Sequence, residues 1–223
     1  MVLNLINNFK NFFYLIVLIG FSASHAGSFD DFFMAIKRDD AGVVSALLNR
    51  GFDPNTLNPD GEHGLILALR EPSLKVIAVL INWPKTNVEA RTLQDESPLM
   101  LASLQGLTDV CEQLIVKDAD VNKPGWSPLH YAATNGHLSV MTLLLDNHAY
   151  IDAASPNGTT PLMMAAQYGT PSAVKLLLEA GADPTLKNDL GLSALDFAQR
   201  PSRPDVIEII ASFIRSRQSN GSW

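Results

Sequence analysis

The sequence predicts an all-α protein, built as a solenoid of about six stacked helix-turn-helix repeats. The first observation is a Ser/Thr-Pro-Leu segment, followed by small residues, a glycine and a leucine-rich stretch, that recurs with a period of about 33 residues. The second is that equivalent positions of the repeats carry the same residue type. Each predicted helix is too short to be stable alone, so we expect neighbouring repeats to bury one continuous core.

Three positions agree when the repeats are aligned on the leucine of this segment. The aligned residues, spaced 30 to 34 apart, are Phe32, Leu65, Leu99, Leu129, Leu162 and Leu195. Three residues later stand Ala35, Ala68, Ala102, Ala132, Ala165 and Ala198. Fifteen residues later stand Leu47, Leu80, Leu114, Leu144, Leu177 and Ile210. Alanine lets paired helices approach closely, and the large apolar residue stacks on the same layer of its neighbours.

The segment 126–153 shows how one repeat is constructed. Ser127 can cap a helix whose first position is Pro128, where a missing N–H costs nothing. Gly136 can adopt the left-handed conformation that ends this helix. A second helix with Leu144 on its apolar side follows, so the segment predicts one helix-turn-helix unit.

Three stretches, SPLHYAATNGH at 127–137, TTPLMMAAQYG at 159–169 and LLLEAGAD at 176–183, closely resemble the ankyrin repeat. The resemblance covers nearly all of the chain after residue 28. It implies an ankyrin-repeat domain over residues 29–214, with short β-hairpin fingers between the repeats. The approximate repeats are 29–58, 59–93, 94–123, 124–156, 157–189 and 190–214.

Some repeats depart from the pattern. The second is expected to be the least regular, because Gly64 and Pro72 replace its proline and glycine. The last should have a shortened first helix because of Pro201 and Pro204, and a flexible polar tail should follow at 215–223. The link before the fourth repeat is three residues shorter than its neighbours, which predicts a notch beside Trp126.

The first 26 residues have the layout of a secretory signal peptide. Lys10 is the only charged residue before Asp30, an apolar run covers 12–21, and Ser24 and Ala26 supply the small residues of a cleavage site. We expect cleavage after Ala26. The alternative is that the segment is retained as an N-terminal membrane anchor.

Composition and motifs exclude several kinds of function. The formal net charge is −7 and the basic residues are scattered, which argues against binding nucleic acid or an anionic membrane. No catalytic, cofactor or metal motif is present, so we expect no enzyme activity, cofactor or metal. The single cysteine, Cys111, is interpreted as a small buried hydrophobe. His130 and His137 fall on the two histidine positions of the ankyrin pattern, where they resemble structural residues.

The resemblance implies a concave partner surface formed by the first helices and the fingers. Carried onto this sequence, the expected partner-binding residues are Leu101, Leu104, Trp126, Tyr131, Asn135, Met164, Gln167 and Tyr168. Aromatic and apolar side chains of this kind are common anchors of protein interfaces. For Tyr131 and Met164 the alternative is that they only pack between adjacent first helices.

These observations predict an exported, periplasmic or secreted protein that binds another protein, of unknown identity, as a monomer. One alternative is a structural scaffold tethered to the membrane by an uncleaved N-terminal anchor. Similar exported bacterial ankyrin proteins also include immunity proteins against toxins and proteins that protect against oxidative stress beside catalases. An immunity or stress-protection role, acting on a toxin or a catalase-like partner, is therefore a further alternative.

Overall fold

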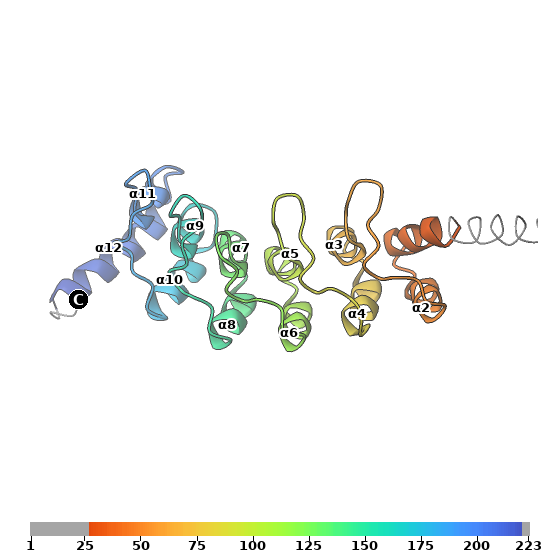
Figure 1. The fold of residues 1–223 in the computed structure, drawn as a ribbon. Coiled ribbons are helices and arrows are strands. Elements are labelled where there is room, and N and C mark those ends of the chain that lie inside the picture. Colours follow the sequence, from red (N-terminus) through yellow and green to blue (C-terminus); the bar gives the residue numbers. More distant parts are fainter. Residues whose placement is uncertain (1–26, 220–223) are drawn as a thin grey trace, which may run out of the picture. The chain divides into compact units, whose positions relative to one another are not determined.

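The computed structural model describes residues 27–219, and all regular elements in that range are helices (Figure 1). The chain divides into two compact units, with unit 1 ending at Thr86 and unit 2 beginning at Asn87. Both units consist of successive helix pairs, as the repeats predict. The expected signal peptide, 1–26, lies outside the described residues.

Unit 1 contains two helix pairs. Residues 27–37 are helical and precede α2 (Ala41–Asn49), while α3 (Gly64–Arg70) and α4 (Leu74–Asn82) form the second pair. The Ser73 hydroxyl donates to the carbonyl oxygen of Ile36 at 2.7 Å and so connects the two pairs. The second pair departs from the usual pattern as expected, because α3 lacks the initial proline and His63 Nδ1 caps it by accepting the Leu65 N–H at 3.1 Å.

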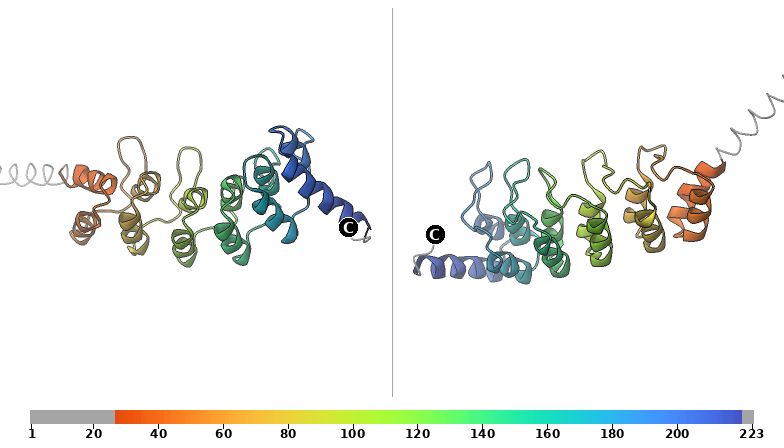
Figure 2. Two further views of the ribbon diagram at one scale, coloured as in Figure 1. Left: turned by 180° about the vertical axis from the view of Figure 1, so that it is seen from behind. Right: turned by 60° about the horizontal axis from the view of Figure 1, so that its bottom comes forward.

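Unit 2 contains four helix pairs. Their bounds are α5 (Pro98–Gln105), α6 (Thr108–Val116), α7 (Pro128–Asn135), α8 (Leu138–Asp146), α9 (Pro161–Gln167), α10 (Pro171–Glu179), α11 (Ala194–Gln199) and α12 (Pro204–Ser219). The first helices α5, α7, α9 and α11 pack on one another in this order, and the second helices α6, α8, α10 and α12 form another layer (Figures 1 and 2).

The residue types shared by the repeats form the core of unit 2. Leu114, Leu144, Leu177 and Ile210 are completely buried, and so are the alanines Ala102, Ala132, Ala165 and Ala198. An alanine on each first helix allows the two layers to approach, and the large residue on each second helix fills the space between them. The predicted register of the repeats is therefore confirmed within this unit.

Two glycines at the same place in their repeats have different roles. Gly136 adopts a left-handed conformation, with φ 69°, and ends α7 as predicted. Gly169 has no positive φ, but a Cβ built on it would lie 2.4 Å from the carbonyl oxygen of Ala133. The first glycine is needed for its backbone conformation, and the second for the close approach of α9 to α7.

Helix α12 is longer than the other second helices. Those of four earlier pairs are followed by a residue of positive φ, namely Gly51, Asp118, His148 and Gly181. In the last repeat Ile214 takes this place, and a β-branched residue strongly disfavours that conformation. The helix therefore continues to Ser219, into the segment 215–223 that was expected to be a flexible tail. Helix α11, by contrast, has only 6 residues, as its two following prolines predict.

The links of unit 2 form hairpin loops, which we call fingers 92–96, 155–159 and 188–192. In each finger the first N–H donates to the carbonyl oxygen of the last residue, at 3.0 to 3.1 Å. Across residues 27–219 the only ladder pairing is one isolated bridge, Leu57 to His63. The predicted fingers thus exist as tight turns with almost no strand character. The link 117–127 is shorter than 147–160 and 180–193, as expected, and has no finger of this kind.

Candidate partner-binding surface

All eight residues expected to bind a partner lie in unit 2. Leu101 and Leu104 are on α5, Tyr131 and Asn135 on α7, Met164 and Gln167 on α9, Tyr168 caps α9, and Trp126 is in the short link 117–127. The structure therefore places six of them on successive first helices, with Trp126 in the link before α7 and Tyr168 directly after α9. Their exposure and their internal contacts decide which of them a partner can reach.

Leu101 and Leu104 contribute less to the surface than expected. Leu101 is only 6% exposed, so the expectation that it faces a partner is wrong. It belongs to the buried residues of α5 and so to the core. Leu104 is half-buried, and its carbonyl oxygen accepts the side-chain N–H groups of Asn135 at 2.7 Å and His137 at 2.9 Å. Asn135 and His137 therefore connect α7 to the end of α5.

Tyr131 is half-buried and has a hydrogen-bond partner within the chain. Its hydroxyl donates to Glu96 Oε1 at 3.0 Å, and Glu96 is the last residue of finger 92–96. Burial and the neighbouring carboxylate both raise the pKa of the Tyr131 phenol above its usual range. The phenol therefore stays protonated and connects α7 to the preceding finger.

Trp126 packs on a buried histidine. Its ring meets that of His130 edge to face, with centroids 5.2 Å apart and planes at 76°. His130 Nδ1 accepts the Ser127 N–H at 3.2 Å, and Nε2 then donates to the carbonyl oxygen of Thr159 at 2.9 Å. Burial lowers the pKa of His130 to about 4, so the ring is neutral near pH 7. These contacts support the expected structural role of His130.

The residues at the end of α9 are more accessible. Tyr168 is 59% exposed, whereas Met164 and Gln167 are half-buried. The Gln167 side-chain amide donates to the Tyr168 hydroxyl at 3.0 Å, and both groups keep further hydrogen-bonding capacity. Tyr168 is thus the most exposed large apolar side chain of the expected set.

Two exposed leucines at finger tips were not among the expected residues. Leu93 in finger 92–96 is 89% exposed, and Leu190 in finger 188–192 is 74% exposed. Figure 2 shows the links on the same side of unit 2. The available signal was a leucine inside a polar turn sequence, TLQDE or NDLGL, where neither turn geometry nor a core requires one.

A polar side chain at the start of each finger holds its tip in place. Thr92 Oγ1 accepts the N–H groups of Gln94 at 3.2 Å and Glu96 at 3.1 Å. In the same way, Asn188 Oδ1 accepts the N–H groups of Leu190 at 3.1 Å and Leu192 at 3.0 Å. The exposed leucines are therefore presented on ordered turns, which lowers the entropy lost when a partner binds them.

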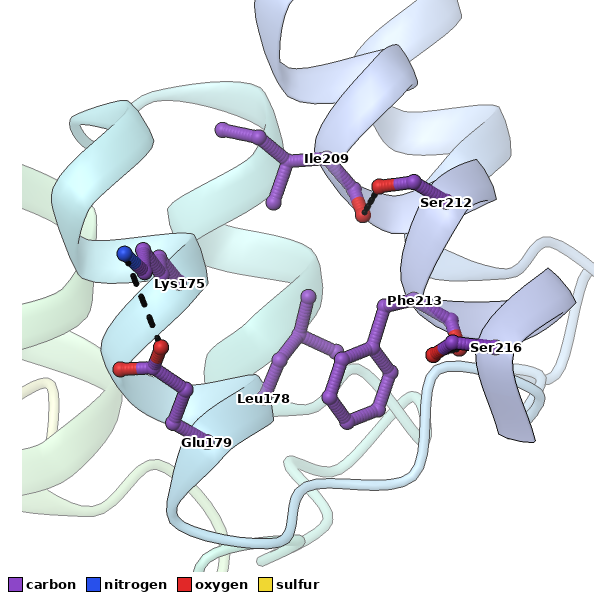
Figure 3. A pocket seen from close by; sticks show the side chains of 7 residues that line it. All are labelled: Lys175, Leu178, Glu179, Ile209, Ser212, Phe213 and Ser216. Atoms are coloured by element: carbon purple, nitrogen blue, oxygen red, sulfur yellow. Dashed lines mark hydrogen bonds and ion pairs between the residues drawn. The ribbon is translucent and has the colours of Figure 1, made fainter. Parts of the chain in front are cut away.

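A groove of about 500 Å³ opens between α10 and α12, at the opposite layer from the expected residues (Figure 3). Its lining consists of Lys175, Leu178, Glu179, Ile209, Ser212, Phe213 and Ser216. Lys175 pairs with Glu179 at 3.7 Å, and the two serine hydroxyls donate to main-chain carbonyls at 3.0 and 2.8 Å. The groove therefore presents an apolar floor with its polar groups already engaged, and we assign it no chemistry.

The described residues offer no site for metal or thiol chemistry. Between residues 27 and 219 no group of three His, Cys, Asp or Glu side chains is placed to hold a metal ion. Cys111 is buried, and burial raises the pKa of its thiol to about 11, so it is unreactive near pH 7. In the same part of the chain, every helix is too short or too polar to cross a membrane.

Comparison with known proteins finds ankyrin repeats throughout the described part of the chain. The sequence profile for three copies of the ankyrin repeat matches residues 32–125, 99–188 and 129–215. A structure similar in fold is a chain in the solved complex of a predatory endopeptidase from Bdellovibrio bacteriovorus with an immunity protein. It has 29% sequence identity and a TM-score of 0.71, and the match covers 82% of this chain and 97% of that one.

Curated proteins with similar sequences are much longer. The mouse ankyrin repeat and SAM domain-containing protein 6 is 33% identical over 132 residues, which is 58% of this chain and 15% of the mouse protein. The ankyrin repeat and KH domain-containing protein mask-1 of Caenorhabditis elegans is 35% identical over 153 residues, which is 66% of this chain and 6% of the worm protein. This chain thus spans only a small part of either relative.

Proposed function

Because the chain belongs to the ankyrin-repeat family, we propose that it is a non-enzymatic protein-binding module that contacts its partner through the finger tips and first helices of unit 2. The observation that carries the proposal is the exposure of Leu93 and Leu190 on ordered turns. Ankyrin-repeat proteins generally act as interaction modules, and exposed apolar side chains on ordered turns suit such a role.

The finger leucines are better anchors than most of the residues expected from the family pattern. Burying a leucine side chain in an interface removes apolar surface from water, which is worth about 1.5–3 kcal/mol. Contacts within the chain already use part of the surface or hydrogen-bonding capacity of Trp126, Tyr131 and Asn135. Tyr168 is the member of the expected set that joins the leucines in the proposed contact.

Differential capture tests this proposal. The purified chain is immobilised and exposed to an extract of the source organism, beside the double variant Leu93→Ser/Leu190→Ser. A matched control is Val116→Ser, which changes an apolar residue of similar exposure, 74%, at the end of α6 and away from the fingers. We expect one set of proteins to bind the wild type and the control but not the double variant. Equal capture by all three would exclude the finger tips as the contact.

The location proposed for this function is outside the cytoplasm, in the periplasm or after secretion. Support comes from the layout of residues 1–26, with its apolar run and small residues before Gly27. Mass spectrometry of the exported protein tests this directly, because cleavage leaves Gly27 at the N-terminus. An intact Met1 would favour the tethered scaffold instead.

A second candidate function is that of an immunity protein acting on an endopeptidase. Support comes from the structural similarity to a chain in the complex of an endopeptidase with an immunity protein, which extends over 97% of that chain. The test is the endopeptidase activity of the organism's exported proteins, measured with the purified wild type or the Leu93→Ser/Leu190→Ser variant. Inhibition by the wild type alone supports an immunity role, and activity unchanged by both rejects it.

A further inference from the structure

Finger 92–96 has a different environment from the other fingers of unit 2. Finger 188–192 contacts finger 155–159 through a main-chain hydrogen bond, from Asp189 N–H to the carbonyl oxygen of Asn157 at 3.0 Å. Finger 92–96 instead adjoins the short link 117–127, which has no finger to offer such a contact. The link compensates with a side chain: Lys123 is only 8% exposed and forms an ion pair with Asp95.

The ion pair belongs to a longer polar network that connects residues 89–95 to the short link 117–127. The Asp120 N–H donates to Glu89 Oε1 at 2.9 Å, and the other carboxylate oxygen of Glu89 binds Arg91. Arg91 Nε lies 3.8 Å from Asp95 Oδ1, and Lys123 binds Oδ2 of the same carboxylate. The first and last members both belong to the short link, so the network joins that link both to Glu89, which precedes the finger, and to Asp95 within it.

A second contact holds the same finger from the side of α7. Tyr131 donates to Glu96 Oε1, and Thr92 Oγ1 lies 3.2 Å from Glu96 Oε2. The finger is therefore held at Asp95 by the short link and at Glu96 by α7. Leu93, the most exposed large apolar side chain among residues 27–217, stands at its tip.

We propose that Lys123 and Tyr131 are positioning residues that brace finger 92–96 and so hold Leu93 ready for the partner. This inference rests on the proposed function for its purpose, but the brace itself requires no partner. An ion pair with one exposed member contributes little to global stability. Its effect is local, because it restricts the motion of a turn that has no core of its own.

Hydrogen exchange of the finger amides tests the brace in the isolated protein. The Asp95 N–H bonds to the Thr92 carbonyl oxygen, and the Glu96 N–H to Thr92 Oγ1. Both amides should exchange about tenfold faster in Lys123→Met and in Asp95→Asn, because the finger opens more often. The double variant should be no faster than Asp95→Asn, since that substitution already removes the Lys123–Asp95 pair. Lys123→Arg should stay close to wild type, and Tyr131→Phe should also accelerate exchange.

Finger 188–192 is the internal control, since it does not contact Lys123, and its Leu190 and Leu192 amides should exchange at the wild-type rate in all variants. Circular dichroism verifies folding, and Asp95→Asn keeps the test valid if Lys123→Met does not fold, because the Asp95 side chain is 67% exposed. Wild-type exchange in finger 92–96 of Asp95→Asn, or acceleration equal in all fingers, would overturn the inference. Failure here leaves the protein-binding proposal intact, because no partner is used.

Discussion

The stacked helices of unit 2 and the fingers between them are stabilised in different ways. The helices depend on residues that recur in each repeat, such as Leu144 and Leu177, which are completely buried. The fingers depend on individual side chains: Thr92 and Asn188 close their own turns, while Lys123 holds a neighbouring finger. The comparison teaches that a change at a buried shared position lowers the stability of the stacked helices, whereas the residues of a finger can vary without disturbing that core.

Removing a shared core residue should have the largest effect on stability. Leu144→Ala deletes a side chain with no exposed surface and should lower the free energy of unfolding by about 2–5 kcal/mol. Urea unfolding followed by circular dichroism measures the loss. Leu138→Ala on the same helix is the control, since Leu138 is 38% exposed and should cost less than about 1 kcal/mol. A Leu144→Ala protein within about 0.5 kcal/mol of wild type would contradict the register.

The next largest effect should be a loss of stability in acid caused by His130. Its folded pKa is about 4, below its usual value of 6.5, so the unfolded chain binds the proton first as the pH falls. The part of the unfolding free energy that depends on a neutral His130 is fully present above pH 6.5. It is lost as the pH falls from there to about 4, by up to roughly 3 kcal/mol. Unfolding free energies measured between pH 7 and 4 should fall less steeply in His130→Gln. The pKa of His63 is lowered similarly, but it is present in both proteins and cancels. If the unfolding free energies of wild type and His130→Gln fall equally with pH, the loss in acid does not come from His130.

The smallest of these stability effects should come from Trp126. Its edge-to-face contact with His130 is worth about 1 kcal/mol, which Trp126→Ala removes. Trp126→Phe retains an aromatic edge and should recover about half of the loss, as measured by the unfolding midpoint. If Trp126→Ala is as stable as wild type, the ring does not support α7 and is free to contact a partner.

The helical part could be derived from the sequence, because the same residue types recur at equivalent positions in six repeats. The end of the last helix was predicted wrongly, although Ile214 indicated that the helix continues. Ile214 occupies a position where the other repeats generally have residues able to adopt a positive φ. Leu101 was assigned to the surface, but it is buried, with only 6% of its surface exposed. The period alone does not reveal how far a neighbouring repeat covers a given side chain.

The candidate surface was harder to derive for the same reason. The contacts from Tyr131 to Glu96 and from Lys123 to Asp95 join residues that lie one repeat apart and belong to no shared pattern. These contacts show which side chains already have partners within the chain, and the repeat pattern does not predict them. Leu93 and Leu190 stand in polar turn sequences, which was the only sequence signal for them, and their exposure in the structure separates them from the core leucines.

The affinity of the captured partner for two matched variants tests most directly whether the finger tips carry binding. Isothermal titration calorimetry compares Leu93→Ser with Val116→Ser, two exposed apolar residues of unit 2 that differ in position. We expect Leu93→Ser to weaken binding by about 2 kcal/mol, roughly a thirtyfold rise in Kd, and Val116→Ser to change it less than about twofold. Both variants should unfold within about 0.5 kcal/mol of wild type. An unchanged Kd for Leu93→Ser, or a larger loss for Val116→Ser, would show that the partner binds elsewhere.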